Sequence, residues 1–380
     1  MNTTPLDPTA ILNDPKRHRL VLEAILKPVS GHLFQPAGFP EIGHVIYKAP
    51  RPGNATQEVC IVDSAASMAN HLETIMHSNP LTYLLHPDLA GLPYVECTTD
   101  EGWPKVTKVG PYRTVITSLS EGHRIASSIF TGKEAVHVVD GKPTAQKFGD
   151  KLKEDFKMPD LGNRTHPQPG DWWNVFKTIY AYDPNSLVHG LLFPALGIKV
   201  PRVLTAHHEA FGATRVETSG VKFDKLDATT SGQPIFARDE ETAVEICATF
   251  VIDLALLRSF GHGDNGLSDA QKSFLLRLAL WKIGKLVGSP FRYRSGCDLE
   301  LVKLVDKGGK DGDVIDTTNL GVIDAAAIKT AAFRSESDKR PAVTQVYWKA
   351  GELYKERKPE VVPPVSGDPA NPDDSDQAPA

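Results

Sequence analysis

Residues 59–77 constrain the fold most, because their apolar pattern changes period within one short run. The run begins with VCIV, four residues typical of a buried strand. Four apolar residues then recur at helical spacing: Met68, Leu72, Ile75 and Met76. The segment therefore predicts a strand that passes directly into a helix, with Asp63 or Ser64 as the N-cap.

Other segments predict further elements. Residues 19–31 (RLVLEAILKPVSG) predict a first strand, and residues 341–358 predict a short strand or helix that closes the fold. Two long helices are predicted over 241–260 and 268–287. The second opens with a capping box, in which Ser268 is followed three residues later by Gln271.

The composition describes an ordinary globular chain with one atypical end. Of its 380 residues, 41% are apolar and 23% are charged. The length allows two or three domains, or one core with long insertions, and residues 131–186 are typical of an inserted lobe. The two predicted helices form a helical pair at 241–288. Residues 359–380 are acidic and rich in proline, which predicts a disordered tail.

Charge and cysteine usage exclude several classes. The net charge is −5, but the tail carries five acids and no Lys or Arg, so the body is neutral. The four cysteines are far apart, without a CxxC pair, which argues against a disulfide framework or a zinc knuckle. No signal peptide or apolar run of membrane-spanning length is visible. We expect a cytoplasmic protein.

Three motifs that resemble cofactor or metal sites lack the context those sites need. GHGDNG (261–266) follows a predicted helix rather than a strand, and no acid lies about 20 residues later. HHEAF (207–211) lacks the second histidine of HExxH, and KGGKDGD (307–313) lacks P-loop and EF-hand spacing. The sequence therefore predicts no cofactor, no metal site and no catalytic residues.

The predicted helix start after residue 63 suits an anion. Its first turn exposes unpaired backbone N–H groups and a partial positive charge, and small polar side chains let a phosphate come close. Ser64, Ser67 and Asn70 could hold such an anion. The competing interpretation, which this motif favours in isolation, is an N-cap followed by solvent-facing polar residues.

Basic residues elsewhere could follow a phosphate backbone. Residues 289–305 alternate as a strand, which places Arg292 and Arg294 on one face, about 7 Å apart. His123, Arg124 and Arg202 are further candidates. Each residue could equally be an ordinary surface cation in a salt bridge.

Several segments together resemble one family. They are LKPVSGHLFQPAGFPEIG (26–43), VDSAASMANHLE (62–73), SLSEGHRIASSIF (118–130), NSLVHGLLF (185–193), PRVLTAHHEA (201–210), SGVKFD (219–224) and FRYRSGCDLE (291–300). In this order they resemble the backbone subunit of the type I-G (formerly I-U) CRISPR Cascade complex. That subunit belongs to the Csb branch of the Cas-seven proteins, in the RAMP superfamily. The resemblance covers about residues 20–305.

The resemblance implies an α+β fold in which residues 1–358 form one RRM-like, ferredoxin-type palm with inserted finger and thumb elements. It implies a non-catalytic protein, not an enzyme, that polymerises along CRISPR guide RNA. The guide then pairs with target DNA in antiviral defence. Implied partners are guide RNA, target DNA, further copies of the chain, a large subunit, Cas-five- and Cas-six-type subunits, and a recruited helicase–nuclease. Backbone contacts suit this role because guide sequences vary.

The resemblance also implies which residues contact the guide. The family pattern S-A-Q-S-M-A-N-R-L-E is kept at Ser64, Ser67 and Asn70, whereas Ala66 replaces its glutamine and His71 its arginine. RNA contacts by those two positions are therefore in doubt. The predicted RNA-binding set is Ser64, Ser67, Asn70, His123, Arg124, Arg202, Arg292 and Arg294, with Gln35 and Phe39 as weaker candidates.

Three alternatives remain open. Related type III subunits cut RNA with a metal and an aspartate in the loop after the first strand, but here residues 28–44 contain only Glu41 as an acid. A small-molecule enzyme would need a tight titratable cluster in a closed cleft. A filament subunit that mainly contacts itself could use the aromatic residues near Trp172 and Trp173, although such clusters are more often core.

Overall fold

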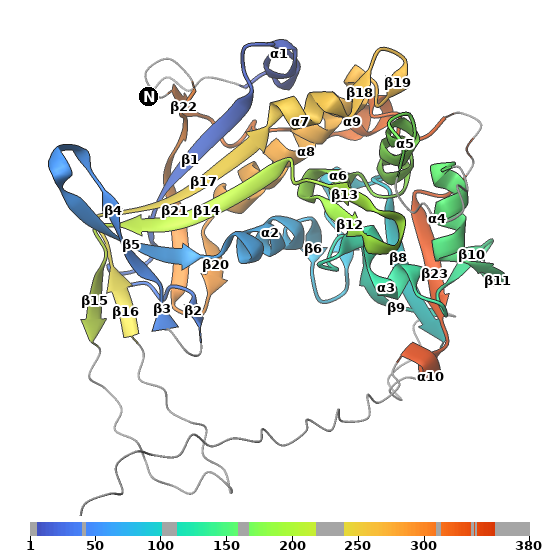
Figure 1. The fold of residues 1–380 in the computed structure, drawn as a ribbon. Coiled ribbons are helices and arrows are strands. Elements are labelled where there is room, and N and C mark those ends of the chain that lie inside the picture. The colour runs from blue at the N-terminus through green and yellow to red at the C-terminus, as the bar shows by residue number, and fades with distance from the viewer. Residues whose placement is uncertain are drawn as a thin grey trace, which may run out of the picture.

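The computed structural model describes residues 6–39, 43–100, 112–158, 167–217, 239–308, 313–335, 338 and 340–353. Two large sheets, five two-stranded pairs and the helices that pack against them make up this part of the chain (Figure 1). The predicted α+β class is confirmed. The RRM-like palm stays a prediction, and residues 359–380 lie outside the described part.

The larger sheet has eight strands, and every pairing in it is antiparallel. The order is β20-β21-β1-β17-β14-β5-β4, with β22 paired to β21. The strands are β1 (Arg19–Pro28), β4 (Ile46–Pro50), β5 (Thr56–Asp63), β14 (Leu204–Phe211), β17 (Glu245–Asp253), β20 (Phe291–Arg294), β21 (Cys297–Asp306) and β22 (Asp313–Ile315). The predicted first strand is confirmed as β1, and KGGKDGD connects the paired strands β21 and β22.

The second sheet has five strands in the order β11-β10-β23-β8-β9, and β23 runs parallel to β8. Its strands are β8 (Tyr94–Asp100), β9 (Tyr112–Thr117), β10 (Val136–Val139), β11 (Lys142–Lys147) and β23 (Val343–Trp348). The closing strand is confirmed at β23. Strands β10 and β11 come from the predicted lobe and pair into this sheet through β23. That the lobe is an insertion stays a prediction.

The helices pack around α8, which opens with the predicted capping box of Ser268 and Gln271. Most of its residues are buried, and it packs against α1, α2, α6, α7 and β17. The helices are α1 (Pro8–Asn13), α2 (Ala65–Thr74), α3 (Ser128–Thr131), α4 (Phe148–Phe156), α5 (Trp172–Tyr182), α6 (Pro184–His189), α7 (Leu254–Ser259), α8 (Asp269–Val287), α9 (Ala325–Thr330) and α10 (Ala350–Leu353). No helix in the described ranges is long and apolar enough to cross a membrane.

Short hairpins connect these elements. GHGDNG forms one of them, between α7 and α8, as expected for a loop rather than a dinucleotide site. The short strands are β2 (Gly38–Phe39), β3 (Gly43–His44), β6 (His77–Asn79), β7 (Leu84–Leu85), β12 (Leu191–Phe193), β13 (Ile198–Val200), β15 (Thr214–Glu217), β16 (Asp239–Thr242), β18 (Gly261–His262) and β19 (Asn265–Gly266).

The predicted helix over 241–260, and with it the helical pair at 241–288, is wrong. Residues 245–253 form β17, a central strand between β1 and β14, and only the short α7 follows it. Alternate residues Ile246, Ala248, Phe250 and Ile252 are buried. Apolar residues also lie between them, so the sequence shows no alternation of apolar and polar residues that would have predicted a strand.

The predicted strand over 289–305 is two strands, because the chain turns at Gly296. This glycine has φ +80°, a left-handed conformation that other residues rarely adopt. The turn makes β20 and β21 a hairpin, with Arg292 opposite Asp298. The register shifts between Arg292 and Arg294, so the two arginines do not present one regular face.

Candidate nucleic-acid interface

The strand-to-helix step is formed as predicted. β5 ends at Asp63, and α2 begins two residues later. Ser64 is the N-cap, and its Oγ accepts a hydrogen bond from the backbone N of Ser67 at 3.1 Å. Asn70 lies one turn further along, where it is exposed. The α2 N-terminus therefore presents small polar residues toward solvent beside a partial positive charge.

The Asp63 carboxylate organises this end of the helix. Its Oδ1 lies 2.7 Å from Arg294 Nη2, and its Oδ2 lies 2.9 Å from His71 Nε2. Ser67 Oγ donates to the same Oδ2 at 3.0 Å. We call Asp63, Ser67, His71 and Arg294 the Asp63 cluster. It joins β5 and α2, which are consecutive in the sequence, to the distant strand β20.

The pKa of Asp63 is held below its usual range. Burial alone would raise the pKa of this carboxyl, but the hydrogen bond from His71, the charge of Arg294 and the hydrogen bond from Ser67 outweigh it. Asp63 therefore stays ionised, and its charge fixes Arg294 at the end of β5.

Arg294 also connects the loop after β1 to the Asp63 cluster. Its Nη1 donates to the carbonyls of Val62 (2.6 Å) and Gln35 (3.3 Å), and its side chain keeps 24% exposure. The backbone N of Gln35 donates to the Gly296 carbonyl at 2.8 Å. Four predicted residues thus come together: Gln35, Ser64, Ser67 and Arg294.

Aromatic rings pack against the His71 side of the Asp63 cluster. The His71 ring packs edge-on against Phe291 and Tyr293, with ring centroids 5.3 and 5.4 Å apart. His208, in β14, contacts Tyr293 with ring centroids 4.6 Å apart and an angle of 59° between the ring planes. Burial lowers the pKa of His208 to about 3, so its ring is neutral near pH 7. Among the described residues, neither ring nitrogen of His208 has a hydrogen-bond partner.

A second polar contact extends from Gln35. Its Nε2 lies 2.9 Å from His44 Nε2, and His44 Nδ1 lies 3.0 Å from the buried Glu241 carboxylate. Arg215 Nε donates to the same carboxylate oxygen at 3.3 Å. Sequence analysis named Asp63 only as a possible N-cap and did not name His44 or Glu241. The contacts Arg294–Asp63 and His44–Glu241 join residues about 200 or more positions apart, so no local pattern shows them.

Arg292 remains at the surface. Its side chain is 70% exposed, and its Nε donates to Asp298 at 2.7 Å across the β20–β21 hairpin. Such an exposed ion pair is weak and can exchange for a phosphate. RNA contact by Arg292 and Arg294 stays a prediction, and the structure shows that the two side chains differ in exposure. Arg292 is open to solvent, whereas Arg294 is held by Asp63 and two carbonyls.

Arg124, another predicted RNA contact, is almost fully buried. It lies in a buried turn with φ +54°, and it makes two hydrogen bonds of 2.7 and 2.8 Å to the Glu73 carboxylate. A third bond, of 3.1 Å, reaches the Gly190 carbonyl. Only 6% of its side chain is exposed. Arg124 therefore has a structural role, and its geometry does not support the predicted guide contact.

Further polar groups enclose Glu73. Asn185 Nδ2 donates to it at 2.8 Å, and the fully buried Lys282 donates to Asn185 Oδ1. Burial lowers the pKa of Lys282 to about 7. We call Glu73, Arg124, Asn185 and Lys282 the Glu73 cluster.

The remaining predicted residues are not brought into the Asp63 cluster. His123 is exposed beside Glu121, with 3.4 Å between His123 Nδ1 and the carboxylate. Arg202 is exposed before β14. Phe39 belongs to β2, but its side chain and Glu41 lie outside the described residues. Of the residues described, no three His, Cys, Asp or Glu side chains are grouped to hold a metal ion.

Comparison with known proteins identifies a family. A solved chain named "CRISPR RNA-guided surveillance complex, pre-nicking" is 14% identical, with 69% of this chain and 71% of that chain covered. Its TM-score is 0.27, so we base no argument on this likeness. No curated protein matches. Residues 20–215, just over half of the chain, match the family model described as CRISPR-associated protein GSU0053. The chain therefore belongs to this CRISPR-associated family.

Proposed function

We propose that the chain is a non-catalytic backbone subunit of a type I-G CRISPR surveillance complex. In this proposal several copies hold one guide RNA through its phosphates and sugars and present its bases to target DNA. The other partners are the large subunit, Cas-five- and Cas-six-type subunits and a recruited helicase–nuclease. Membership of a CRISPR-associated family supports this role. The single structural observation that carries it is the polar surface at the start of α2.

This surface has the chemistry that a sequence-independent contact requires. The exposed N-terminus of α2 offers backbone donors, and Ser67 and Asn70 add polar side chains. Arg292, two residues before Arg294 in β20, adds an exposed cation. None of these groups needs to read a base edge. Asp63 and Arg294 hold β5, α2 and β20 together, so the surface is organised before RNA arrives.

RNA binding by the purified protein tests the proposal. Two RNAs of equal length and unrelated sequence should bind with the same affinity in fluorescence anisotropy, and the affinity should fall as salt rises. The variant Ser67→Ala/Asn70→Ala/Arg292→Ala should weaken both RNAs by at least about tenfold. A matched control, Ser273→Ala/Asn174→Ala/Arg51→Ala, removes the same residue types elsewhere and should bind as the unchanged protein does.

Two results would contradict the proposal. One is an affinity that depends on base sequence, and the other is equal binding by the two triple variants. Cleavage of either RNA with Mg²⁺ present would instead support an RNA-cleaving subunit.

A further inference from the structure

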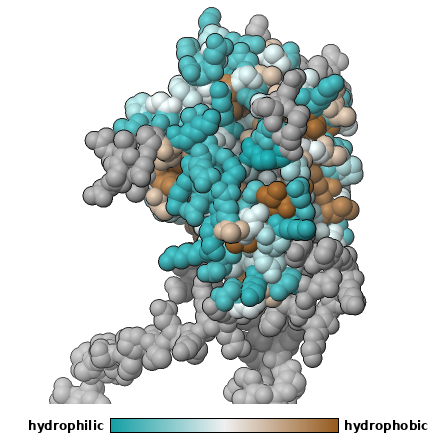
Figure 2. Space-filling model, turned by 90° about the vertical axis from the view of Figure 1, so that its right-hand side faces the viewer, coloured by the Kyte–Doolittle hydropathy of each residue, from teal (hydrophilic) through white to brown (hydrophobic). Residues whose placement is uncertain are grey.

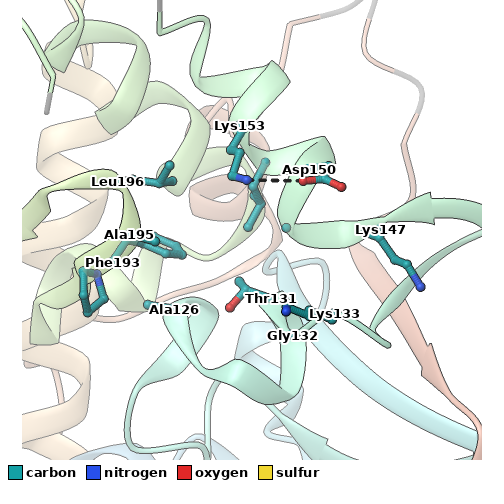
Figure 3. Close-up of a pocket in the computed structure, with 13 residues that line it drawn as sticks. Ala126, Thr131, Gly132, Lys133, Lys147, Asp150, Lys153, Phe193, Ala195 and Leu196 are labelled. Carbon is teal, nitrogen blue, oxygen red and sulfur yellow. Dashed lines mark hydrogen bonds and ion pairs between the residues drawn. The ribbon is translucent and has the colours of Figure 1, made fainter. Parts of the chain in front are cut away.

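A cavity of about 410 Å³ lies between α4 and the turn that follows β12. Figure 3 shows Phe193, Ala195 and Leu196 along one side and Lys133 and Lys147 along the other. Lys153 lies at the upper rim of this view. We call this cavity the lysine pocket. It shares no residue with the Asp63 cluster.

The lysine pocket carries more positive than negative charge. Three lysines and a single carboxylate, Asp150, line it. Lys153 Nζ lies 3.3 Å from Asp150, and Lys147 Nζ lies 3.9 Å from Glu134 outside the lining. These four side chains are 40% to 62% exposed, so both ion pairs are weak and can exchange partners. The pocket therefore suits a segment that brings carboxylates.

The opposite wall suits an aliphatic segment. It is made by Phe193, Pro194, Ala195 and Leu196, and Leu152 lines the pocket from α4. Phe193 and Leu152 are themselves buried. Figure 2, which faces the side that carries α4 and β11 in Figure 1, shows small brown areas separated by teal. Apolar surface on this side is thus local, and an occupant needs only a short apolar run.

The last strand of the described chain, β23, ends beside this pocket. Trp348, the last residue of β23, donates from its indole N to the Ile129 carbonyl of α3 at 2.6 Å. Gly132, which lines the pocket, lies so close that a Cβ on it would meet the Trp348 ring at 3.1 Å. The described chain ends five residues later, at Leu353. The following six residues, if extended, reach about 20 Å.

The sequence beyond that point has the matching chemistry. Residues 360–376 carry five acids and no Lys or Arg, and the run VVPPV (361–365) is aliphatic. Proline lowers the entropy that a segment loses on docking. A polynucleotide fits less well, because the buried Phe193 gives no open ring for base stacking and Asp150 repels phosphate.

We propose that residues 360–376 dock in the lysine pocket of their own chain. VVPPV contacts the wall of Phe193, Pro194 and Leu196, and the acids that flank it pair with Lys133, Lys147 and Lys153. This contact does not depend on guide binding, so it can be tested without RNA.

Carbodiimide crosslinking, which joins carboxylates to lysine amines directly, tests the proposal on the full-length protein. Mass spectrometry should find the tail acids joined to the pocket lysines at least about tenfold more often than to three exposed lysines elsewhere, Lys16, Lys48 and Lys303. A one-to-one mixture of unlabelled and ¹⁵N-labelled protein should give crosslinks within single chains. High salt should reduce their yield.

A variant that keeps every reacting group separates docking from chance collision. Val361→Ser/Val362→Ser/Val365→Ser should lower the pocket crosslinks at least about fivefold, because it removes the aliphatic contact. The matched control Val29→Ser/Val244→Ser/Val302→Ser changes exposed valines of the body and should leave the yield unchanged.

Three results would overturn the proposal. Crosslinks spread evenly over pocket and other lysines would show a free tail, and crosslinks between labelled and unlabelled chains would show docking on a second copy. The third result is a short uridine RNA that photocrosslinks to the pocket equally with and without residues 359–380. That result would show that nucleic acid, rather than the tail, occupies the lysine pocket.

Discussion

Helix α2 carries a polar cluster near each end, and the two differ in their access to water. At its start, the Asp63 cluster leaves 24% of the Arg294 side chain exposed. Near its end, the Glu73 cluster leaves only 6% of the Arg124 side chain exposed. Both clusters pair an arginine with a buried carboxylate. Exposure, rather than residue type, therefore separates a surface that can receive an anion from a cluster that fixes the fold.

The difference has an energetic consequence. Breaking a buried ion pair leaves a charge without a partner in a medium of low dielectric constant, which costs several kcal/mol. An exposed pair such as Arg292–Asp298 contributes at most about 1 kcal/mol. The expected effects of substitution on stability therefore fall from the Glu73 cluster to the Asp63 cluster and then to the surface.

The largest effect is expected for Glu73→Ala, which strands Arg124 in the interior. The free energy of unfolding should fall by about 3–5 kcal/mol in urea titrations. The control Glu58→Ala removes an exposed acid from β5 and should change it by less than about 0.5 kcal/mol. Equal stability of these two variants would show that the Glu73 cluster does not stabilise the fold.

The Asp63→Asn variant should have the next largest effect, because it removes the charge that holds Arg294 and His71. At pH 6 we expect a loss of about 1.5–3 kcal/mol. The folded pKa of Asp63 is lowered, so its contribution exists above the unfolded pKa of about 3.9 and is lost as pH falls through the folded pKa. The difference between the two proteins should therefore shrink below about pH 4. A difference that stays constant to pH 3 would contradict the pairing.

The Glu73 cluster should also respond to alkaline pH through Lys282. Its folded pKa is about 7, so between pH 7 and 9 the unfolded chain binds more protons than the folded one. Stability relative to Lys282→Met should therefore rise by on the order of 2 kcal/mol over this range. Burial also raises the pKa of all four cysteines, which lowers the stability of the folded state as pH rises. The cysteines are the same in both proteins, so this effect cancels in the difference between their stabilities. A pH-independent difference between the proteins would refute a protonation change at Lys282.

The smallest effect on stability is expected for Arg292→Ala, below about 1 kcal/mol. Its effect on RNA should be distinct: the slope of log affinity against log salt should fall by about one unit, as for one lost phosphate contact. Lys303→Ala, on the neighbouring β21, is the control and should keep the slope. An unchanged slope in Arg292→Ala would remove this residue from the proposed surface.

Local signals predicted the elements that carry the candidate site. The change of period at residue 63 identified β5 and α2, and the Ser268–Gln271 box identified the start of α8. Strand β17 was predicted as a helix because it is apolar on both alternating sets of residues. A central strand of this kind has no visible period of two.

Side-chain partners were much less predictable than elements. Arg294 meets Asp63, and Arg124 meets Glu73, only because strands and turns from distant parts of the sequence pack together. Sequence patterns describe neighbours along the chain, whereas these pairs depend on strand order and register. The sequence therefore indicated Ser64 and Ser67 at the helix start but could not separate an exposed arginine from a buried one.

The guide RNA content of the protein, co-expressed with its CRISPR array and neighbouring genes, tests the central claim most directly. Size exclusion, absorbance ratio and RNA sequencing should show a large particle that holds one defined spacer–repeat RNA. Recovery of an RNA-free monomer or small oligomer under the same conditions would contradict the claim.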